Sequence, residues 1–190
     1  SERTFKVASE LVRAGVKPAK VSQAVFASYP WSKIELLGEV LTTLKRDESG
    51  RVAWLVQTQE MQRRTGASDE DGDGFVNYPM SCGDVEACAF FKETSPGTYR
   101  VSLRSKCDVN VARIAERFGG GGHRNAAGCT FHGTVADAER DIVSLLVDAV
   151  DNRGVGAATG PLPAQAALDA RPQEVVAAAE HRGAERDARP

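Results

Sequence analysis

The sequence predicts an α/β domain: a mixed β-sheet flanked by helices and preceded by connector helices. Two observations carry this prediction. Apolar runs suited to buried strands are separated by segments with helical spacing, which is typical of parallel strands joined by helical crossovers. Pro96-Gly97 lies between two strand-like segments, which predicts an antiparallel hairpin in the same sheet. A sheet that contains both kinds of pair is mixed.

Residues 1–45 are predicted to form three helices. Apolar side chains recur at helical spacing from 1 to 15, from 18 to 26 and from 31 to 44. Ser1 is a candidate N-cap of the first helix, and Pro18 suits the first turn of the second. The chain begins at Ser1 without Met or a signal-peptide pattern, which leads us to expect an internal fragment or a trimmed chain.

Residues 46–152 are predicted to form the sheet domain. Its helices are a short one over 59–65 ended by Gly66, one capped by Asp108 or Asn110, and an amphipathic one over 134–150. Its strands are expected over 51–58, 85–92, 99–106 and 127–131. Residues 153–190 are rich in Ala, Pro and Arg and lack aromatic side chains, so we expect a disordered or weakly helical tail with His181 in solvent.

Four consecutive glycines, Gly119 to Gly122, precede His123 and Arg124. A backbone without Cβ atoms can adopt positive φ and can turn successive N–H groups toward one anion. His123 adds a side-chain donor at the end of this turn, and Arg124 adds a positive charge. A helix stop or a flexible linker would also contain glycine. The small-residue run that follows argues against a linker, and one glycine would suffice for a stop, so we favour a phosphate-binding loop.

The strand over 99–106 alternates, with Arg100, Ser102, Arg104 and Lys106 on one face. A solvated strand face explains this pattern, and so does a wall that supplies a guanidinium to the glycine loop. Arg104 is the better candidate on this strand, because a planar guanidinium binds a phosphate through two hydrogen bonds. We leave Arg100 with the solvated face.

Composition limits the classes of partner. A net charge of -2 argues against a broadly basic nucleic-acid surface, so any nucleic-acid contact is expected to be a local pocket. No apolar run is long enough to span a membrane. The four cysteines show no CxxC spacing, and Cys88 and Cys129 lie in apolar strand-like runs, so we expect reduced core cysteines in a cytoplasmic protein and no zinc site.

The acidic segment 69–74 is similar in spacing to a calcium loop, but Met80 stands where that loop requires a bidentate Glu. We therefore reject calcium and expect a solvated loop or a helix start. His132 follows the last predicted strand and is expected to be an exposed strand-end residue.

The segment 120–128, Gly-Gly-Gly-His-Arg-Asn-Ala-Ala-Gly, resembles the GGGHxxAAG motif of the DHHA1 domain. This is the C-terminal, substrate-binding domain of DHH-superfamily phosphoesterases. Segments 55–58, 75–79 and 101–106 resemble further landmarks of the branch that contains bacterial oligoribonucleases and 3'-phosphoadenosine 5'-phosphate (pAp) phosphatases. The resemblance spans about 1–152 and makes residues 1–45 the connector from an N-terminal catalytic domain.

The resemblance implies a substrate site in this chain and chemistry elsewhere. Members of the superfamily use two metal ions held by Asp and His, and this chain has no Asp-His-His motif and no His-Asp cluster, so Mn²⁺ and the catalytic residues are expected on a DHH domain before Ser1. The expected ligand is short single-stranded RNA or DNA, or pAp; a homodimer is left open. The site residues that the resemblance implies are Asn77, Arg104, Lys106, Gly120, Gly121, Gly122, His123 and Asn125. Two alternatives are a cyclic dinucleotide phosphodiesterase of the same superfamily and a nucleic-acid-binding module without catalysis.

Overall fold

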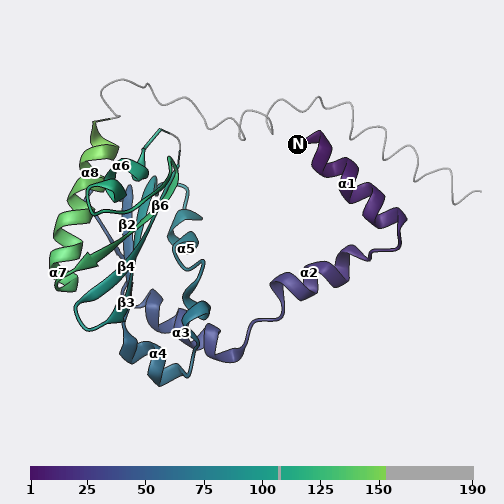
Figure 1. Ribbon diagram of the computed structural model, residues 1–190, viewed down its shortest axis with the longest axis horizontal. Coiled ribbons are helices and arrows are strands. Elements are labelled where there is room, and N and C mark those ends of the chain that lie inside the picture. The colour runs from purple at the N-terminus through teal and green to yellow at the C-terminus, as the bar shows by residue number, and fades with distance from the viewer. Residues whose placement is uncertain (107, 153–190) are drawn as a thin grey trace, which may run out of the picture. The chain divides into compact units, whose positions relative to one another are not determined.

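A six-stranded mixed sheet is the centre of the computed structural model, which describes residues 1–106 and 108–152 (Figure 1). Its order is β1-β2-β3-β4-β6-β5. β2 and β3 are parallel, and the other neighbouring pairs are antiparallel. The predicted mixed sheet is therefore confirmed. The strands are β1 (Lys45–Arg46), β2 (Val52–Gln57), β3 (Ala87–Ser95), β4 (Thr98–Ser105), β5 (Gly121–His123) and β6 (Ala126–His132).

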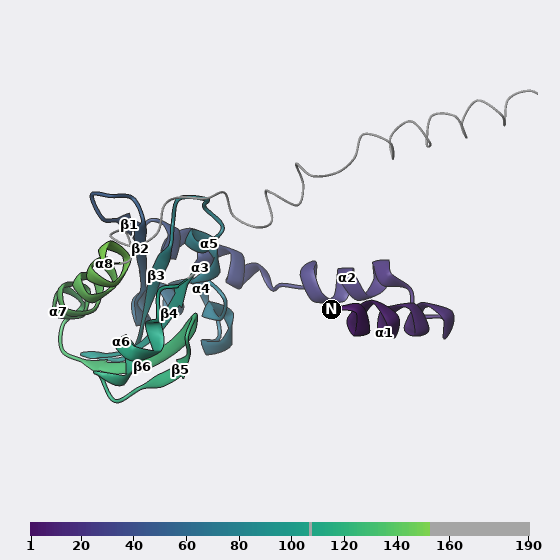
Figure 2. The same ribbon diagram turned by 90° about the horizontal axis from the view of Figure 1, so that it is seen from above.

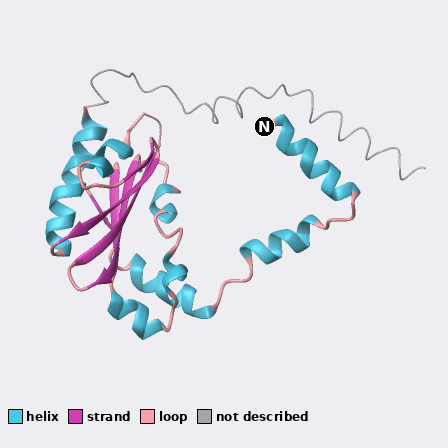
Figure 3. Cartoon of the chain, viewed as in Figure 1, coloured by secondary structure: helices cyan, strands magenta, loops and turns pink. Residues whose placement is uncertain are grey.

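One face of the sheet is covered by the C-terminal helices (Figures 1 and 3). These are α6 (Val111–Glu116), α7 (Val135–Ala138), the π-helical segment η2 (Glu139–Val143) and α8 (Ser144–Asp151). Large side chains such as Phe91, Leu103 and Leu146 are fully buried between sheet and helices. The predicted helix over 134–150 is thus confirmed in extent, with a π-helical segment inside it.

The opposite face is covered over β2 and β3 by α3 (Trp31–Leu41), α4 (Gln59–Thr65), the 3₁₀ helix η1 (Asp69–Gly72) and α5 (Asn77–Met80) (Figure 2). The second core cluster lies here, and the sheet residues in it come from β2 and β3. Within the described residues, β4, β5 and β6 contribute nothing to that cluster. On this face β4 instead presents Arg100, Ser102 and Arg104, all at least partly exposed.

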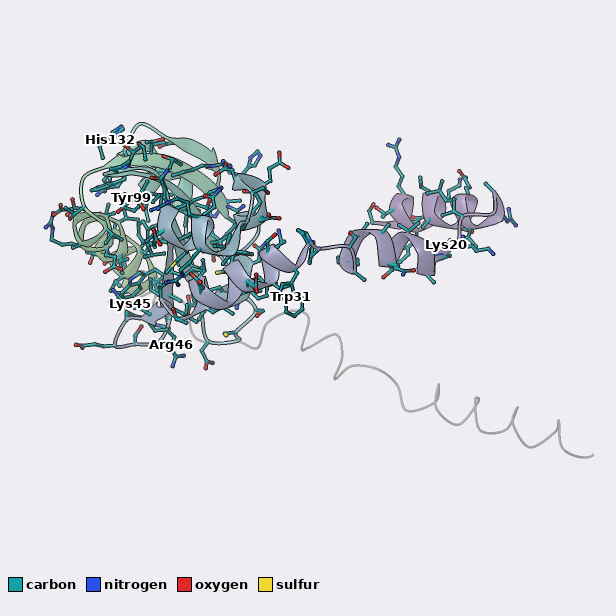
Figure 4. The ribbon with its side chains drawn as sticks, turned by 90° about the horizontal axis from the view of Figure 1, so that it is seen from below. Lys20, Trp31, Lys45, Arg46, Tyr99 and His132 are labelled. Atoms are coloured by element: carbon teal, nitrogen blue, oxygen red, sulfur yellow. The ribbon has the colours of Figure 1, made fainter. Side chains whose placement is uncertain are left out.

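Two pairs of side chains lie on opposite sides of the folded part. Lys45 and Arg46 on the edge strand β1 lie on one side of the folded part, and Tyr99 and His132 lie toward the other (Figure 4). His132 is exposed at the end of β6, as predicted, and its Nδ1 lies 3.4 Å from the Thr98 hydroxyl.

The three N-terminal helices begin as predicted, but the third ends early. α1 (Glu2–Arg13) is capped by the Ser1 hydroxyl, α2 (Pro18–Phe26) begins at its proline, and neither helix has a buried residue. α3 ends at Leu41, whereas the sequence predicted a helix to Leu44. The reason is Thr43, whose hydroxyl donates to the Val40 carbonyl and accepts from the Val56 amide, so the chain turns into the sheet here.

The acidic segment is a helix start, because Ser68 and Asp71 form a capping box at η1. Cys88 and Cys129 are buried free thiols, as expected of core cysteines. In the described part of the chain, no helix combines the length and the apolar character needed to cross a bilayer. The predicted tail over 153–190, with His181, lies outside the described residues.

Candidate phosphate-binding site

The glycine run begins with a helix stop. The Gly120 amide donates to the Ala115 carbonyl at 2.9 Å, the Gly119 amide donates to the Glu116 carbonyl at 3.1 Å, and Gly119 has a φ of 71°. These paired bonds around a left-handed glycine form a Schellman motif, which satisfies the last carbonyls of α6. The helix-stop interpretation is therefore correct for Gly119.

Gly120 and Gly122 allow two segments to pass closely. A Cβ on Gly120 would lie 2.1 Å from the Gly128 carbonyl oxygen, and a Cβ on Gly122 would lie 2.6 Å from the Ala126 carbonyl oxygen. Residues Gly121–His123 form the edge strand β5, paired with β6. The predicted turn with converging N–H groups is thus wrong: the segment is extended, because pairing with β6 fixes its backbone.

Gly121 differs from its two neighbours. It is exposed, and no atom lies within 4 Å of the position that a Cβ would occupy. Its cross-strand partner is Gly128, which in turn pairs with Ser102 on β4. A ligand can therefore approach the bare backbone at Gly121 and Gly128 from the open face of the sheet.

The strand register brings Arg104 and His123 onto one face. Arg104 pairs with Ala126, and Ala126 pairs with His123. Residues that lie directly opposite one another in a sheet project on the same side, and two strand spacings separate Arg104 from His123 by about 10 Å. Ala126, which lies between them, has a small side chain. It therefore leaves space between the Arg104 guanidinium and the His123 imidazole.

Arg104 also lines a pocket of about 270 Å³ beside this row. Its side-chain Nη1 donates to its own strand, to the Leu103 carbonyl at 2.9 Å. Within the described residues, neither Arg104 nor Arg100 forms an ion pair with a carboxylate, so both guanidinium groups retain donors for a ligand. The pocket is lined by Gly72, Asp73, Gly74, Val76, Phe90, Lys92, Arg100, Ser102 and Arg104.

Lys92 is a buried cation at this pocket that sequence reasoning missed. Its side chain is 4% exposed, and its ammonium group lies 2.8 Å from a carboxylate oxygen of Asp69 and also donates to the Asp69 carbonyl. Every residue of β3 from Ala87 to Lys92 is buried, so the sequence shows a continuous apolar run that gives no sign of a buried lysine at its end. Lys92 thereby ties η1, the roof of the pocket, to the sheet.

Gly72 in that roof passes directly over Gln57, the β2 neighbour of Lys92. A Cβ on Gly72 would lie 2.3 Å from the Gln57 Oε1. Gln57 is fully buried, and its side-chain amide nitrogen and oxygen have no hydrogen-bond partner among the described residues. The roof therefore lies against the Gln57 amide, which would have to move to admit a larger residue at position 72.

Cys88 lies opposite Arg104 in the strand register. Burial raises the pKa of this thiol to about 12, and the charge of Arg104 only partly opposes that effect. The thiol is therefore neutral near pH 7 and acts as a core side chain and not as a nucleophile.

Of the predicted site residues, all of which lie in the described part of the chain, Arg104 alone lines this pocket. The Lys106 ammonium donates to the Cys82 carbonyl at 2.6 Å, and the Asn125 amide donates to the Ser105 hydroxyl at 3.1 Å. Asn77 lines a separate pocket of about 400 Å³. Arg124 likewise pairs with Asp108 at 3.2 Å. The structure thus brings together Arg104, His123 and Gly121, and places Lys106, Asn77 and Asn125 elsewhere.

The structure distinguishes between the two predicted caps of α6. Asn110 is the N-cap, with its side chain accepting from the Ala112 amide. The described residues contain no cluster of three or more His, Cys, Asp or Glu side chains able to hold a metal ion. No step through a metal is therefore assigned to these residues.

Comparisons with known proteins show the family of this chain. The DHHA1 domain family matches residues 56–152, about half of the chain. A relative from Streptococcus mutans, described as a probable bifunctional oligoribonuclease and PAP phosphatase NrnA, is 31% identical over 128 residues, which are 67% of this chain and 40% of the relative. The Thermus thermophilus bifunctional oligoribonuclease and PAP phosphatase NrnA is 34% identical over 133 residues, which are 70% of this chain and 39% of that protein.

A solved structure is also similar. The crystal structure of an exopolyphosphatase-related protein from Bacteroides fragilis has a TM-score of 0.69 and 30% identity, covering 80% of this chain and 44% of that one. The chain spans about two fifths of the length of the S. mutans and T. thermophilus relatives. With its mixed sheet, its glycine-rich β5–β6 segment and the match over 56–152, this chain belongs to the DHHA1 domain family.

Proposed function

We propose that this chain is the substrate-binding part of a metal-dependent phosphoesterase that hydrolyses short oligoribonucleotides, pAp, or both. The observation that carries the proposal is the placement of Arg104 and His123 in one row on the open face of the sheet. A guanidinium and an imidazole about 10 Å apart at the backbone can both reach a phosphate that lies between them. Membership of the DHHA1 family and the names of the relatives from S. mutans and T. thermophilus support the substrate class.

The residues of this chain bind and orient the ligand in this proposal. Arg104 neutralises a phosphate, His123 donates a hydrogen bond to it, and the bare backbone at Gly121 lets the sugar–phosphate chain lie close to β5. A nucleotide held in this way loses its translational and rotational freedom on binding and not in the chemical step. The rate of hydrolysis then rises when a catalytic centre faces the scissile bond.

The catalytic centre belongs to a second domain in this proposal. A DHH domain of the same protein would hold Mn²⁺ and supply the activated water, and the present chain alone would be inactive. The relatives are more than twice as long as the matched segment, which leaves room for such a domain in them.

Binding of a 5'-phosphorylated dinucleotide tests the proposal. We expect saturable binding to the chain in calorimetry, and we expect Arg104→Ala and His123→Ala each to weaken it by about 1.5–3 kcal/mol, because each removes a charge-assisted hydrogen bond. Arg113→Ala is the matched control, since this exposed arginine lies on α6, on the other face of the sheet.

Three results would contradict the proposal or change its substrate. Binding that neither Arg104→Ala nor His123→Ala weakens would move the site away from this row. A cyclic dinucleotide that binds much more tightly than the linear one would favour the phosphodiesterase alternative. Tight binding of long single strands, without preference for short ones, would favour a nucleic-acid-binding module.

A further inference from the structure

An acidic segment, residues 68–74, forms one wall of the pocket beside Arg104. It contains the roof η1, and its last three residues, 72–74, line the pocket. Its acidic side chains are Asp69, Glu70, Asp71 and Asp73. The cations that line the pocket from the sheet are Lys92, Arg100 and Arg104. The segment therefore places negative charge next to the cations that a phosphate would need.

The acidic segment has no apolar side chain to hold it in place. Among the described residues, neither core cluster includes any member of 68–74, whereas the flanking Ala67 and Phe75 are both buried in the second cluster. Lys33 donates to the Asp73 carbonyl over 3.4 Å at an exposed position, and Gly74 has a φ of 89°. Segments with few buried apolar contacts open locally at a low cost in free energy. Residues 68–74 can therefore move as a unit between two fixed ends.

The Lys92 ammonium is the buried group that holds the segment on the sheet. It lies 2.8 Å from an Asp69 carboxylate oxygen and also donates to the Asp69 carbonyl. The Lys92 side chain is 4% exposed, and that of Asp69 is 66% exposed. Because Lys92 also lines the pocket, a bound phosphate can replace the carboxylate. Such an exchange leaves the ammonium paired with an anion, so no unpaired buried charge results.

The position of the segment also leaves a polar group without a partner. Gly72 lies against the buried side-chain amide of Gln57, which has no hydrogen-bond partner among the described residues. An unpaired buried amide is unfavourable, and water can hydrogen-bond to it once the segment moves away. The Lys92–Asp69 pair therefore favours the closed position, and the Gln57 amide opposes it.

We propose that residues 68–74 are a lid that the ligand displaces, and that Lys92 passes from the Asp69 carboxylate to a ligand phosphate. The inference rests on the proposed function and adds to it a ligand contact, Lys92, and an autoinhibitory residue, Asp69. When only the open form binds, the apparent affinity falls in proportion to the fraction of open molecules. Loosening the lid should therefore tighten binding, whereas loss of a purely structural ion pair would leave binding unchanged or weaken it.

The direction of the change in affinity tests the lid. The 5'-phosphorylated dinucleotide pApA is titrated by calorimetry into the unaltered chain, Asp69→Ala, Asp69→Asn and the double variant Asp69→Ala/Lys92→Met. Both single variants should bind pApA about fivefold or more tightly, as is usual for coupling between a ligand and a conformational equilibrium. The double variant should bind about tenfold or more weakly than Asp69→Ala, because the ligand loses a charge-assisted contact. The control Glu70→Ala, which removes an exposed carboxylate from the same helix, should change affinity less than about twofold.

Acetylation of lysine followed by mass spectrometry gives a second measurement. The Lys92 ammonium should react about fivefold or more rapidly in Asp69→Ala than in the unaltered chain, because more molecules are open. Saturating pApA should then slow the reaction of Lys92 in Asp69→Ala, since the phosphate covers the ammonium. Lys92 that reacts equally in the two chains, or that pApA fails to protect in the variant, would contradict the lid.

The outcomes of the titrations separate the lid from the proposed function. If neither Asp69 variant binds more tightly while Arg104→Ala still weakens binding, the lid is wrong and the proposed function stands. Equal tightening by Glu70→Ala would mean general electrostatic repulsion and would also overturn the lid. A double variant that binds as tightly as Asp69→Ala would exclude Lys92 as a ligand contact. Absence of pApA binding to both the unaltered chain and Asp69→Ala would overturn the proposed function and the lid with it.

Discussion

Gly120→Ala is expected to destabilise the fold by at least about 3 kcal/mol, at the upper end of the usual cost of overpacking. The new Cβ would lie 2.1 Å from the Gly128 carbonyl oxygen and 2.7 Å from the Cys129 Cα. Both are backbone atoms of β6, a strand paired on both sides, so they cannot move without disturbing the sheet. For a domain of this size the melting temperature should fall by on the order of 10 °C.

Gly121→Ala is the matched control for that experiment. It adds the same methyl group one residue later, where nothing lies within 4 Å of it and the residue is exposed. Its free energy of unfolding should change by less than about 0.5 kcal/mol. Equal effects of the two substitutions in denaturant or thermal unfolding would show that close packing does not explain why glycine is present at 120.

Asp69→Ala is expected to destabilise the protein by about 3 kcal/mol, because it leaves the Lys92 ammonium buried without its carboxylate. Lys92→Met should cost less, within about 1 kcal/mol. It removes the buried charge itself, and the Asp69 side chain, which is 66% exposed, can then be solvated. The effect of breaking this pair is therefore asymmetric, and urea unfolding of both variants measures it.

The neighbouring residue provides the control for the ion pair. Glu70 is also acidic, exposed and in η1, and its side chain makes no ion pair or hydrogen bond among the described residues. Glu70→Ala should change stability by less than about 0.5 kcal/mol. Equal losses of stability in Lys92→Met and Asp69→Ala would contradict this account. They would mean that the bonds of the Lys92 ammonium stabilise the roof, and that a buried unpaired charge does not explain the effect of Asp69→Ala.

The sequence predicted elements well where one local signal decides the structure. Gly66 ends α4 in the left-handed conformation, and Pro96-Gly97 joins β3 and β4 as expected. The glycine run shows the limit of such signals. Its composition is compatible with a helix stop, a turn and close packing, and the structure contains the stop and the packing at different glycines. Only the pairing of β5 with β6 decides which glycine has which role.

The site was predicted in part for a related reason. Alternation along 99–106 correctly places Arg100 and Arg104 on one face, but it cannot show that residues from 72–76 line a pocket together with both. Alternation alone therefore assigns Arg100 to solvent, and the apolar run of β3 gives no sign of a buried Lys92. Asn125 and Lys106 were predicted from the motif, but their hydrogen bonds to Ser105 and Cys82 depend on neighbours distant in sequence.

A double-mutant cycle tests whether Arg104 and His123 act on the same phosphate. Calorimetry with pApA on the unaltered chain, Arg104→Ala, His123→Ala and the double variant gives the coupling free energy between the two side chains. If they hold one phosphate, the effects should be non-additive by about 0.5–3 kcal/mol. Effects that add to within about 0.5 kcal/mol would mean two independent contacts and would contradict the shared site.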